Sequence, residues 1–307
     1  MRDLRFALTL LAASTLMLSA CGGGDTESAP ATAPSSASAE DTVCASTDAT
    51  DDLLADICDS GTITVSTDPK YPPQSSLDQG TGEYVGFDID VATAIADRLG
   101  VDIAWETPSW SLITAGGWNG RWDMSVGSMT PTNDRQEVLH FTEPYYFTPA
   151  VVVANEANTS ISDLSTDLDG TRIGVCSGCS YEQFLDKSLE IDGFEFDFAI
   201  DDAEVSGYDT DTTALQDLAL GDGTRLDAVI TSATTAQGYV DSGRPVKTVG
   251  EPVFYEPLAA AFDKNAELDP TSLVEAVDGI VKEMHSDGTL GAASKEWYDG
   301  LDLSVQQ

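Results

Sequence analysis

Apolar residues along the chain alternate between two spacings, one typical of short buried strands and one typical of amphipathic helices. A run rich in β-branched residues at 62–66 predicts a strand, and the proline-rich segment 68–73 that follows must be a loop. Apolar positions recur at helical spacing over 91–99, and Gly100 marks the end of that helix. The pattern continues with a strand at 101–105, a short helix at 110–118 and a strand at 122–126. Strands that alternate with helices imply a mostly parallel sheet covered on both faces.

A second alternating series follows an extended apolar segment at 145–154. We predict strands at 171–175, 194–198 and 227–231, and helices at 181–187 and 212–220. Another extended apolar run at 254–262 precedes two C-terminal helices at 271–287 and 292–298. This order describes an α/β chain of two lobes joined by two extended crossings, with a ligand cleft at the carboxyl ends of the strands. The predicted division is 43–152 for lobe 1, 153–250 for lobe 2, and 251–307 for a return to lobe 1.

The first 20 residues have the character of a cleaved secretory signal peptide. Arg2 and Arg5 precede an apolar run that is shorter than the roughly 20 residues a membrane-spanning helix needs. The run ends in Leu-Ser-Ala-Cys, which resembles the bacterial lipobox, so we predict that Cys21 becomes the lipidated N-terminus. The alternative is an ordinary signal peptide with a chance cysteine. Residues 21–42 are rich in Gly, Ser, Ala, Pro and Thr, and this composition predicts a flexible tether.

Composition and charge exclude several classes of protein. The 307 residues include 14 Lys and Arg against 53 Asp and Glu, a formal charge of −39, which would repel nucleic acid. With 41% hydrophobic residues the chain can bury large cores, and its length suits two domains. His140 and His285 are too few for an imidazole zinc or copper site, so we expect no metal and no cofactor. Solubility is the expected cause of the charge, and attraction of a cationic ligand is the alternative.

Export would place the cysteines in an oxidising compartment. Apart from Cys21, the chain has Cys44, Cys58, Cys176 and Cys179, which allow three connectivities. Proximity in sequence favours disulfides between Cys44 and Cys58 and between Cys176 and Cys179. The alternative for the second pair is a thioredoxin-like redox motif, in which Cys-x-x-Cys opens a helix after a strand.

The segment Gly-Phe-Asp-Ile-Asp-Val at 86–91 resembles the motif of the family 3 solute-binding proteins, the polar amino acid receptors of ABC importers. Other segments with family character follow in the family's order over about residues 60–299. They are Asp-Pro-Lys-Tyr-Pro-Pro at 68–73, Gly-Ser-Met-Thr-Pro-Thr at 127–132, Phe-Thr-Glu-Pro-Tyr-Tyr at 141–146, Gly-Val at 174–175 and Lys-Glu-Trp-Tyr at 295–298.

The resemblance implies the two-lobed periplasmic-binding-protein fold (type II). It also implies a monomeric, lipid-anchored extracytoplasmic receptor that closes around a small zwitterion and presents it to a membrane permease. A sensor role, in which the closed form contacts a membrane receptor, is equally compatible with the sequence. No enzyme activity is expected, although relatives of the fold include a periplasmic dehydratase. Such an enzyme needs a general acid or base in the cleft, where the mapped ionisable residues are only Asp68 and Arg135.

The resemblance also assigns a carboxylate site. The family's residue at the position of Arg135 clamps the ligand's carboxylate, and the residues matching Gly127, Ser128 and Thr130 add hydrogen bonds. A guanidinium fork suits a carboxylate, whereas a lone arginine would more simply form a surface salt bridge. In lobe 2, the turn at Cys179, Ser180 and Tyr181 offers backbone N–H groups as a second grip, with helix capping by Ser180 as the alternative. Cys179 stands where the family usually has a hydroxyl residue.

Three further residues match positions around the ligand's side chain. Tyr71 and Trp110 match the two apolar or aromatic walls, which would suit a planar or cationic group, although Tyr71 could be a loop anchor and Trp110 a core residue. Asp68 matches a position that contacts the side-chain cation in binders of basic amino acids. Its competing role is to organise the Asp-Pro turn. Together these residues favour a basic amino acid, with arginine as the first candidate.

Ser232 departs from the family pattern. Family members that bind α-amino acids have an Asp at this position, which accepts from the ligand's ammonium group. A neutral hydroxyl is a poorer partner for a desolvated ammonium. Either another carboxylate takes this role, or the ligand is a different cationic carboxylate such as ectoine or an opine.

Overall fold

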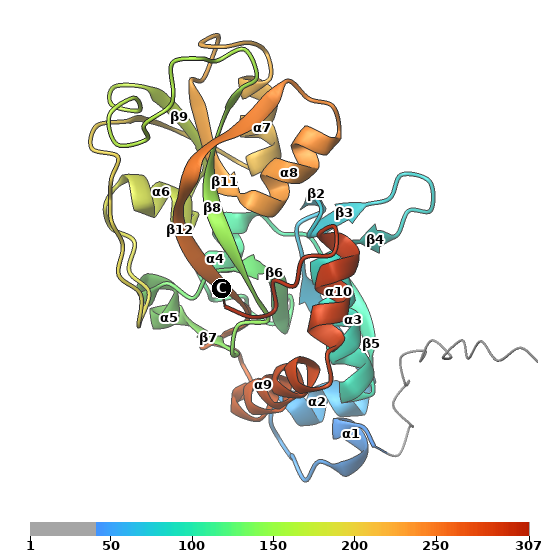
Figure 1. Ribbon diagram of the computed structural model, residues 1–307. Helices are drawn as coiled ribbons and strands as arrows, with labels where there is room; N and C mark the ends of the chain where they lie inside the picture. The colour runs from blue at the N-terminus through green and yellow to red at the C-terminus, as the bar shows by residue number, and fades with distance from the viewer. Residues whose placement is uncertain (1–40, 307) are drawn as a thin grey trace, which may run out of the picture. The chain divides into compact units, whose positions relative to one another are not determined.

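The computed structural model describes residues 41–306, in which a long mixed sheet runs through two lobes (Figure 1). Its strand order is β10-β9-β11-β8-β12-β6-β1-β5, and β7 pairs with β12 outside this path. The predicted signal peptide at 1–20, the lipidation at Cys21 and the tether as far as residue 40 lie outside the described residues. Within 41–306, no helix has the length and apolar character needed to cross a membrane.

Lobe 1 is built on three parallel strands, in which β1 lies between β5 and β6. The apolar face of α3 packs against the two C-terminal helices, and Ile95 and Leu99 of α3 are fully buried. A small separate sheet of β2, β3 and β4 includes Lys70–Tyr71, so the segment 68–73, which was predicted to be a loop, contains a short strand. The elements are α1 Val43–Ser46, α2 Leu53–Ser60, β1 Thr62–Ser66, β2 Lys70–Tyr71, β3 Ser75–Leu77, β4 Tyr84–Val85, α3 Phe87–Leu99, β5 Asp102–Glu106, α4 Trp110–Thr114, β6 Met124–Met129, α5 Asn133–Val138, β7 Leu139–Phe141, α9 Thr271–Ser286 and α10 Thr289–Trp297.

Lobe 2 repeats the same design with its own apolar core. Strand β9 pairs in parallel with β10 and with β11, and the helix after each strand packs beside the sheet. The elements are β9 Arg172–Cys176, α6 Ser180–Leu185, β10 Glu204–Tyr208, α7 Asp211–Leu218, β11 Ala228–Ser232 and α8 Ala233–Asp241. The strand ends of both lobes are therefore followed by loops and helix starts, which is where ligands of such sheets bind.

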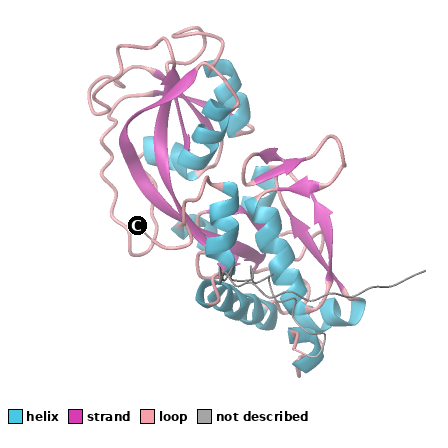
Figure 2. Cartoon of the chain, turned by 45° about the vertical axis from the view of Figure 1, so that its right-hand side comes forward, coloured by secondary structure: helices cyan, strands magenta, loops and turns pink. Residues whose placement is uncertain are grey.

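Two long antiparallel strands, β8 Tyr146–Asn155 and β12 Val246–Asp263, join the lobes. Strand β8 pairs with β11 of lobe 2, while the far end of β12 pairs with β6 and β7 of lobe 1. Figure 2 shows these strands passing from one lobe to the other. The two predicted extended crossings are thus paired strands, whereas the boundaries at 152/153 and 250/251 remain predictions.

The predicted strand at 194–198 is wrong. Its alternation of apolar residues arises because Phe194, Phe196 and Phe198 pack against the core of lobe 2, with the Phe196 ring 5.8 Å from that of Phe254. The segment forms no ladder, because the edge of β9 is taken instead by β10. The alternation of phenylalanines therefore reflects burial of their rings and does not indicate strand pairing here.

The predicted disulfide between Cys44 and Cys58 is present and ties α1 to α2 at the start of the described chain. A cross-link that closes a loop of this length stabilises the fold by about 3 kcal/mol. We expect the double variant Cys44→Ser/Cys58→Ser to lose about that much free energy of unfolding in urea titrations. Its affinity for ligand should stay unchanged, because the bridge is remote from the site described below. A weakened affinity at unchanged stability would contradict this purely structural role.

Candidate ligand-binding site

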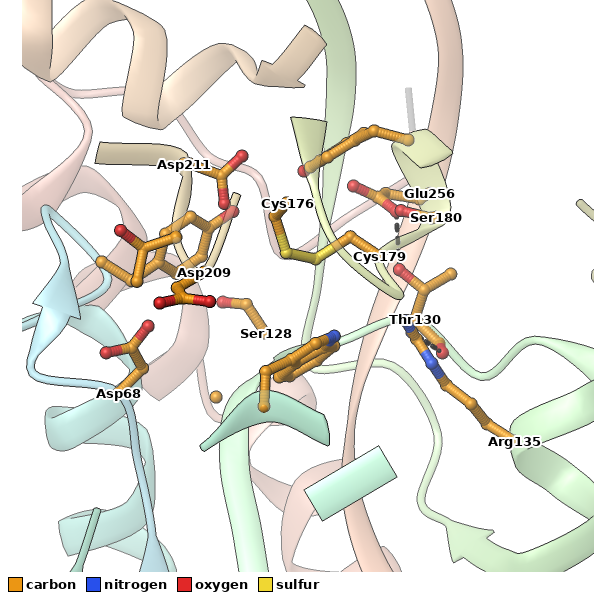
Figure 3. A pocket seen from close by; sticks show the side chains of 15 residues that line it. Asp68, Ser128, Thr130, Arg135, Cys176, Cys179, Ser180, Asp209, Asp211 and Glu256 are labelled. Atoms are coloured by element: carbon orange, nitrogen blue, oxygen red, sulfur yellow. Dashed lines mark hydrogen bonds between the residues drawn. A yellow bond between two sulfur atoms is a disulfide. The ribbon is translucent and has the colours of Figure 1, made fainter. Parts of the chain in front are cut away.

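One pocket gathers every residue predicted to contact the ligand except Ser232 (Figure 3). Lobe 1 contributes Asp68, Tyr71, Trp110, Gly127, Ser128, Thr130 and Arg135, and lobe 2 contributes Cys179, Ser180 and Tyr181. The lining also includes Cys176, Asp209, Thr210, Asp211 and Glu256, none of which was predicted to contact the ligand. The pocket is therefore formed jointly by the two lobes and by the joining strand β12.

Arg135 lies in α5, whose first turn is fixed by the cap of Thr132. Its Nη1 donates to the Thr130 carbonyl at 2.8 Å, and its Nη2 donates to the Gly178 carbonyl of lobe 2, also at 2.8 Å. The guanidinium lies 5.0 Å from the centroid of the Trp110 ring. Burial lowers the pKa of Arg135 to about 10, so the group is still charged at neutral pH. Arg135 is only 5% exposed, so a surface salt bridge is wrong, and the residue instead links the lobes beside the pocket.

Glu256 of β12 is a buried acid that sequence reasoning missed. Its Oε2 accepts hydrogen bonds from Thr130 Oγ1 and from Ser180 Oγ, each at 2.6 Å, so one carboxylate holds a hydroxyl from each lobe. Burial raises the pKa of Glu256, while the two hydroxyls and the charge of Arg135 oppose that rise. The available signal was a single acid near the start of the apolar run at 254–262.

The turn before α6 is shaped by the second predicted disulfide, between Cys176 and Cys179. Cys179 occupies the cap position of α6 and Ser180 is its first residue, so the alternative of capping by Ser180 is wrong. The Ser180 hydroxyl binds Glu256 instead. The Gly178 N–H donates to Glu182 Oε2 at 2.6 Å, which leaves fewer free amides at this turn than the sequence suggested.

The two predicted aromatic walls both touch lobe 2. Trp110 Nε1 donates to the Gly178 carbonyl at 3.3 Å, and the Tyr71 hydroxyl donates to Ser232 Oγ at 3.2 Å. Ser232 is fully buried behind Tyr71, where its hydroxyl caps α8 by accepting from the Thr235 N–H. Ser232 therefore has a local structural role and does not line the pocket.

Three aspartates line the side of the pocket away from Arg135 (Figure 3). Asp68 accepts from the Lys70 N–H at 2.9 Å, so it organises its turn while it faces the pocket, and burial raises its pKa. Asp209 is exposed, whereas Asp211 is 5% exposed and burial raises its pKa to about 7. With Glu256, the pocket holds four carboxylates. The expectation that Asp68 and Arg135 are its only ionisable residues is wrong.

Ser128, on the wall of the pocket, is held in place by Asp88, a buried acid near the start of α3. Ser128 Oγ donates to Asp88 Oδ2 at 2.8 Å, and the Tyr145 hydroxyl donates to Asp88 Oδ1, also at 2.8 Å. Asp88 is fully buried, and burial raises its pKa to about 7. Gly86, just before α3, lets the Pro73–Gln74 backbone approach closely, because its φ of 138° and the nearby Gln74 carbonyl leave no room for a side chain.

Two α/β lobes that share a buried, charged pocket define a ligand-binding protein of the two-lobed class. The model of the bacterial extracellular solute-binding proteins, family 3, matches residues 63–300, and the chain belongs to this family. The family's extracellular character places the protein outside the cytoplasm. Within the described residues, no group of His, Cys, Asp or Glu could hold a metal ion.

Known relatives bind several amino acids. The chain is 28% identical to the L-cystine-binding protein of Escherichia coli (strain K12), over 82% of this chain and 88% of the relative. It is 29% identical to the L-arginine-binding protein of Pseudomonas aeruginosa (strain PAO1), over 61% of this chain and 68% of the relative.

Solved structures show the same fold. An ancestral arginine-binding protein bound to arginine is 32% identical with a TM-score of 0.66, over 78% of this chain and 98% of that one. The ancestral amino acid-binding protein AncCDT-1, a precursor of cyclohexadienyl dehydratase, is 27% identical with a TM-score of 0.68. The match covers 80% of this chain and 99% of that one.

Proposed function

We propose that the protein is the substrate-binding component of an ABC importer and closes its lobes around a small polar or basic amino acid. L-arginine is the first candidate. The observation that carries this proposal is the polarity of the pocket, with the Arg135 guanidinium on one side and three aspartates on the other. A zwitterion with a cationic side chain would complement both sides.

Contacts between the lobes support closure as the mechanism. Besides Arg135, the Thr212 hydroxyl of lobe 2 donates to the Lys70 carbonyl at 2.9 Å, and the Asn133 N–H donates to the Glu190 carbonyl, also at 2.9 Å. A ligand that contacts both lobes stabilises the closed form by its differential affinity for that form. The closed form would then be presented to the permease.

The proposal extends to the cell surface. Cys21 would carry the lipid, residues 21–42 would tether the lobes to the membrane, and the folded part would act as a monomer. The Cys176–Cys179 bridge would serve as a rigid wall of the pocket and not as a redox centre; this role is supported by both cysteines lining the pocket and by the bond of Arg135 to Gly178 in the bridged turn.

A second candidate is a dehydratase-like enzyme on the same scaffold. It is favoured by two buried carboxyl groups in the pocket, Asp211 and Glu256, whose pKa values are raised by burial. Asp211, whose pKa burial raises to about 7, can hold a proton near neutral pH and act as a general acid. Another cationic carboxylate, such as ectoine or an opine, is the alternative ligand for a binding role, because Ser232 is neutral.

One screen tests these possibilities together. In a thermal-shift panel of amino acids, opines and compatible solutes, we expect L-arginine to raise the melting temperature most, because it binds only the native protein. Mass spectrometry of the same samples after incubation should recover the ligand unchanged. Conversion of a stabilising compound would support the enzyme, and a larger shift with ectoine or an opine would contradict the arginine assignment.

A further inference from the structure

Asp211 is the one acid of the pocket that combines deep burial with an unused oxygen. It is 5% exposed, and its Oδ1 has no hydrogen-bond partner. The Thr231 hydroxyl at the end of β11 lies next to this carboxyl group and opposes the rise in pKa that burial causes. Glu256, in contrast, already accepts from two hydroxyls, and Asp68 accepts from a backbone N–H.

The surroundings of Asp211 provide no counter-charge. Within residues 41–306, no Lys or Arg forms a salt bridge with it. The charged groups that act on it are Glu256 and Asp68, both acidic. A buried carboxylate without a partner is costly, and an arriving cation removes that cost. The Asp211 carboxyl group, which lines the pocket without a counter-charge, is thus suited to a positively charged ligand atom.

The position of Asp211 also accounts for the neutral residue at Ser232. Asp211 begins α7 and acts electrostatically on Tyr71, whose hydroxyl contacts Ser232. The Asp211 carboxyl group is therefore close to Tyr71 and Ser232. Unlike the neutral Ser232, it lines the pocket.

We propose that Asp211 accepts a cationic nitrogen of the bound amino acid and supplies the counter-charge that Ser232 cannot. This inference rests on the proposed function, since it requires a ligand with an ammonium or guanidinium group. It makes Asp211 a specificity-determining residue: ligands without a positive charge at this point would leave the carboxylate buried and unpaired.

The test compares two acids of lobe 2 by isothermal titration calorimetry with L-arginine as the probe. Asp211→Asn should weaken binding about 100-fold or more, as expected when one partner of a buried charge pair is removed. Asp202→Asn is the control, because Asp202 is an exposed acid of lobe 2 outside the pocket lining, and it should change affinity by no more than about threefold. Without ligand, Asp211→Asn should melt no lower than the wild type at pH 8, because it removes an unpaired charge.

Two analogues separate a ligand contact from a structural role. Citrulline has a neutral side chain, and 5-guanidinopentanoate lacks the α-ammonium group. The penalty of Asp211→Asn should disappear with the analogue that lacks the contacted nitrogen. A penalty that persists with both analogues, or none with L-arginine, would overturn the role of Asp211 and leave the proposed function intact. A wild type that binds none of L-arginine, L-lysine and L-ornithine would contradict the basic-ligand assignment and this inference together.

Discussion

Replacing Arg135 with alanine is expected to abolish binding of L-arginine while the protein stays folded. The side chain is 5% exposed, is charged at neutral pH and lies at the pocket between Thr130 and Gly178. Removal of a buried group that pairs with a ligand carboxylate costs several kcal/mol, so we expect affinity to fall by roughly three orders of magnitude. Titration calorimetry gives the affinity, and circular dichroism confirms the fold.

Arg121→Ala is the matched control for Arg135→Ala. Arg121 also lies over a tryptophan, with its guanidinium 4.8 Å from the Trp122 ring centroid, but it is exposed and outside the pocket. Its loss should leave affinity within about twofold of the wild type. Equal losses in the two variants would mean that a general loss of cations lowers binding. Normal affinity in Arg135→Ala would remove this residue from the site.

The second large effect is a pH dependence of stability that comes from Asp88. Burial raises its pKa from 3.8 to about 7, so between these values the folded protein binds a proton that the unfolded chain has lost. The free energy of unfolding should therefore fall as the pH rises from about 4 through about 7, by up to about 4 kcal/mol for this group. Urea titrations at several pH values measure this slope.

Asp88→Asn isolates the contribution of Asp88. The amide cannot ionise, so the difference in unfolding free energy between wild type and variant should shift in favour of the variant as the pH rises through this window. Asp97→Asn, on the exposed side of the same helix, is the control and should leave the wild-type slope unchanged. Asp211 adds to the wild-type slope in the same direction, because burial also raises its pKa to about 7. A wild-type stability that rises from pH 4 to pH 7 would contradict this account.

Local patterns predicted much of the fold because each lobe is built from short units whose burial follows sequence spacing. The strand at 62–66 coincides with β1, and the helix expected at 91–99 starts a few residues earlier, at Phe87. The alternation of Phe194, Phe196 and Phe198 led to a wrong strand prediction, because burial of every second residue does not require pairing with another strand. The antiparallel pairing of β8 with β12 was also beyond reach, because register between distant segments leaves no local signal.

For the candidate site too, sequence patterns predicted some residues and missed others. Motif spacing pointed to Arg135, Thr130 and Tyr71, and these residues do line one pocket. Glu256 and Asp211 were missed because their importance comes from burial at the junction of the lobes, which depends on the tertiary fold. In a chain with 53 acidic residues, the apolar run around Glu256 was the one local sign of its burial, and Asp211 had no such sign.

The central claim is that the two lobes enclose one amino acid, held by Arg135 and faced by acids. Titration of L-arginine into the purified wild-type protein at pH 7 tests this claim most directly. We predict binding of one molecule per chain with a dissociation constant of about 1 μM or below, about −8 kcal/mol. No heat of binding with L-arginine, together with none for L-cystine or L-histidine, would contradict the account.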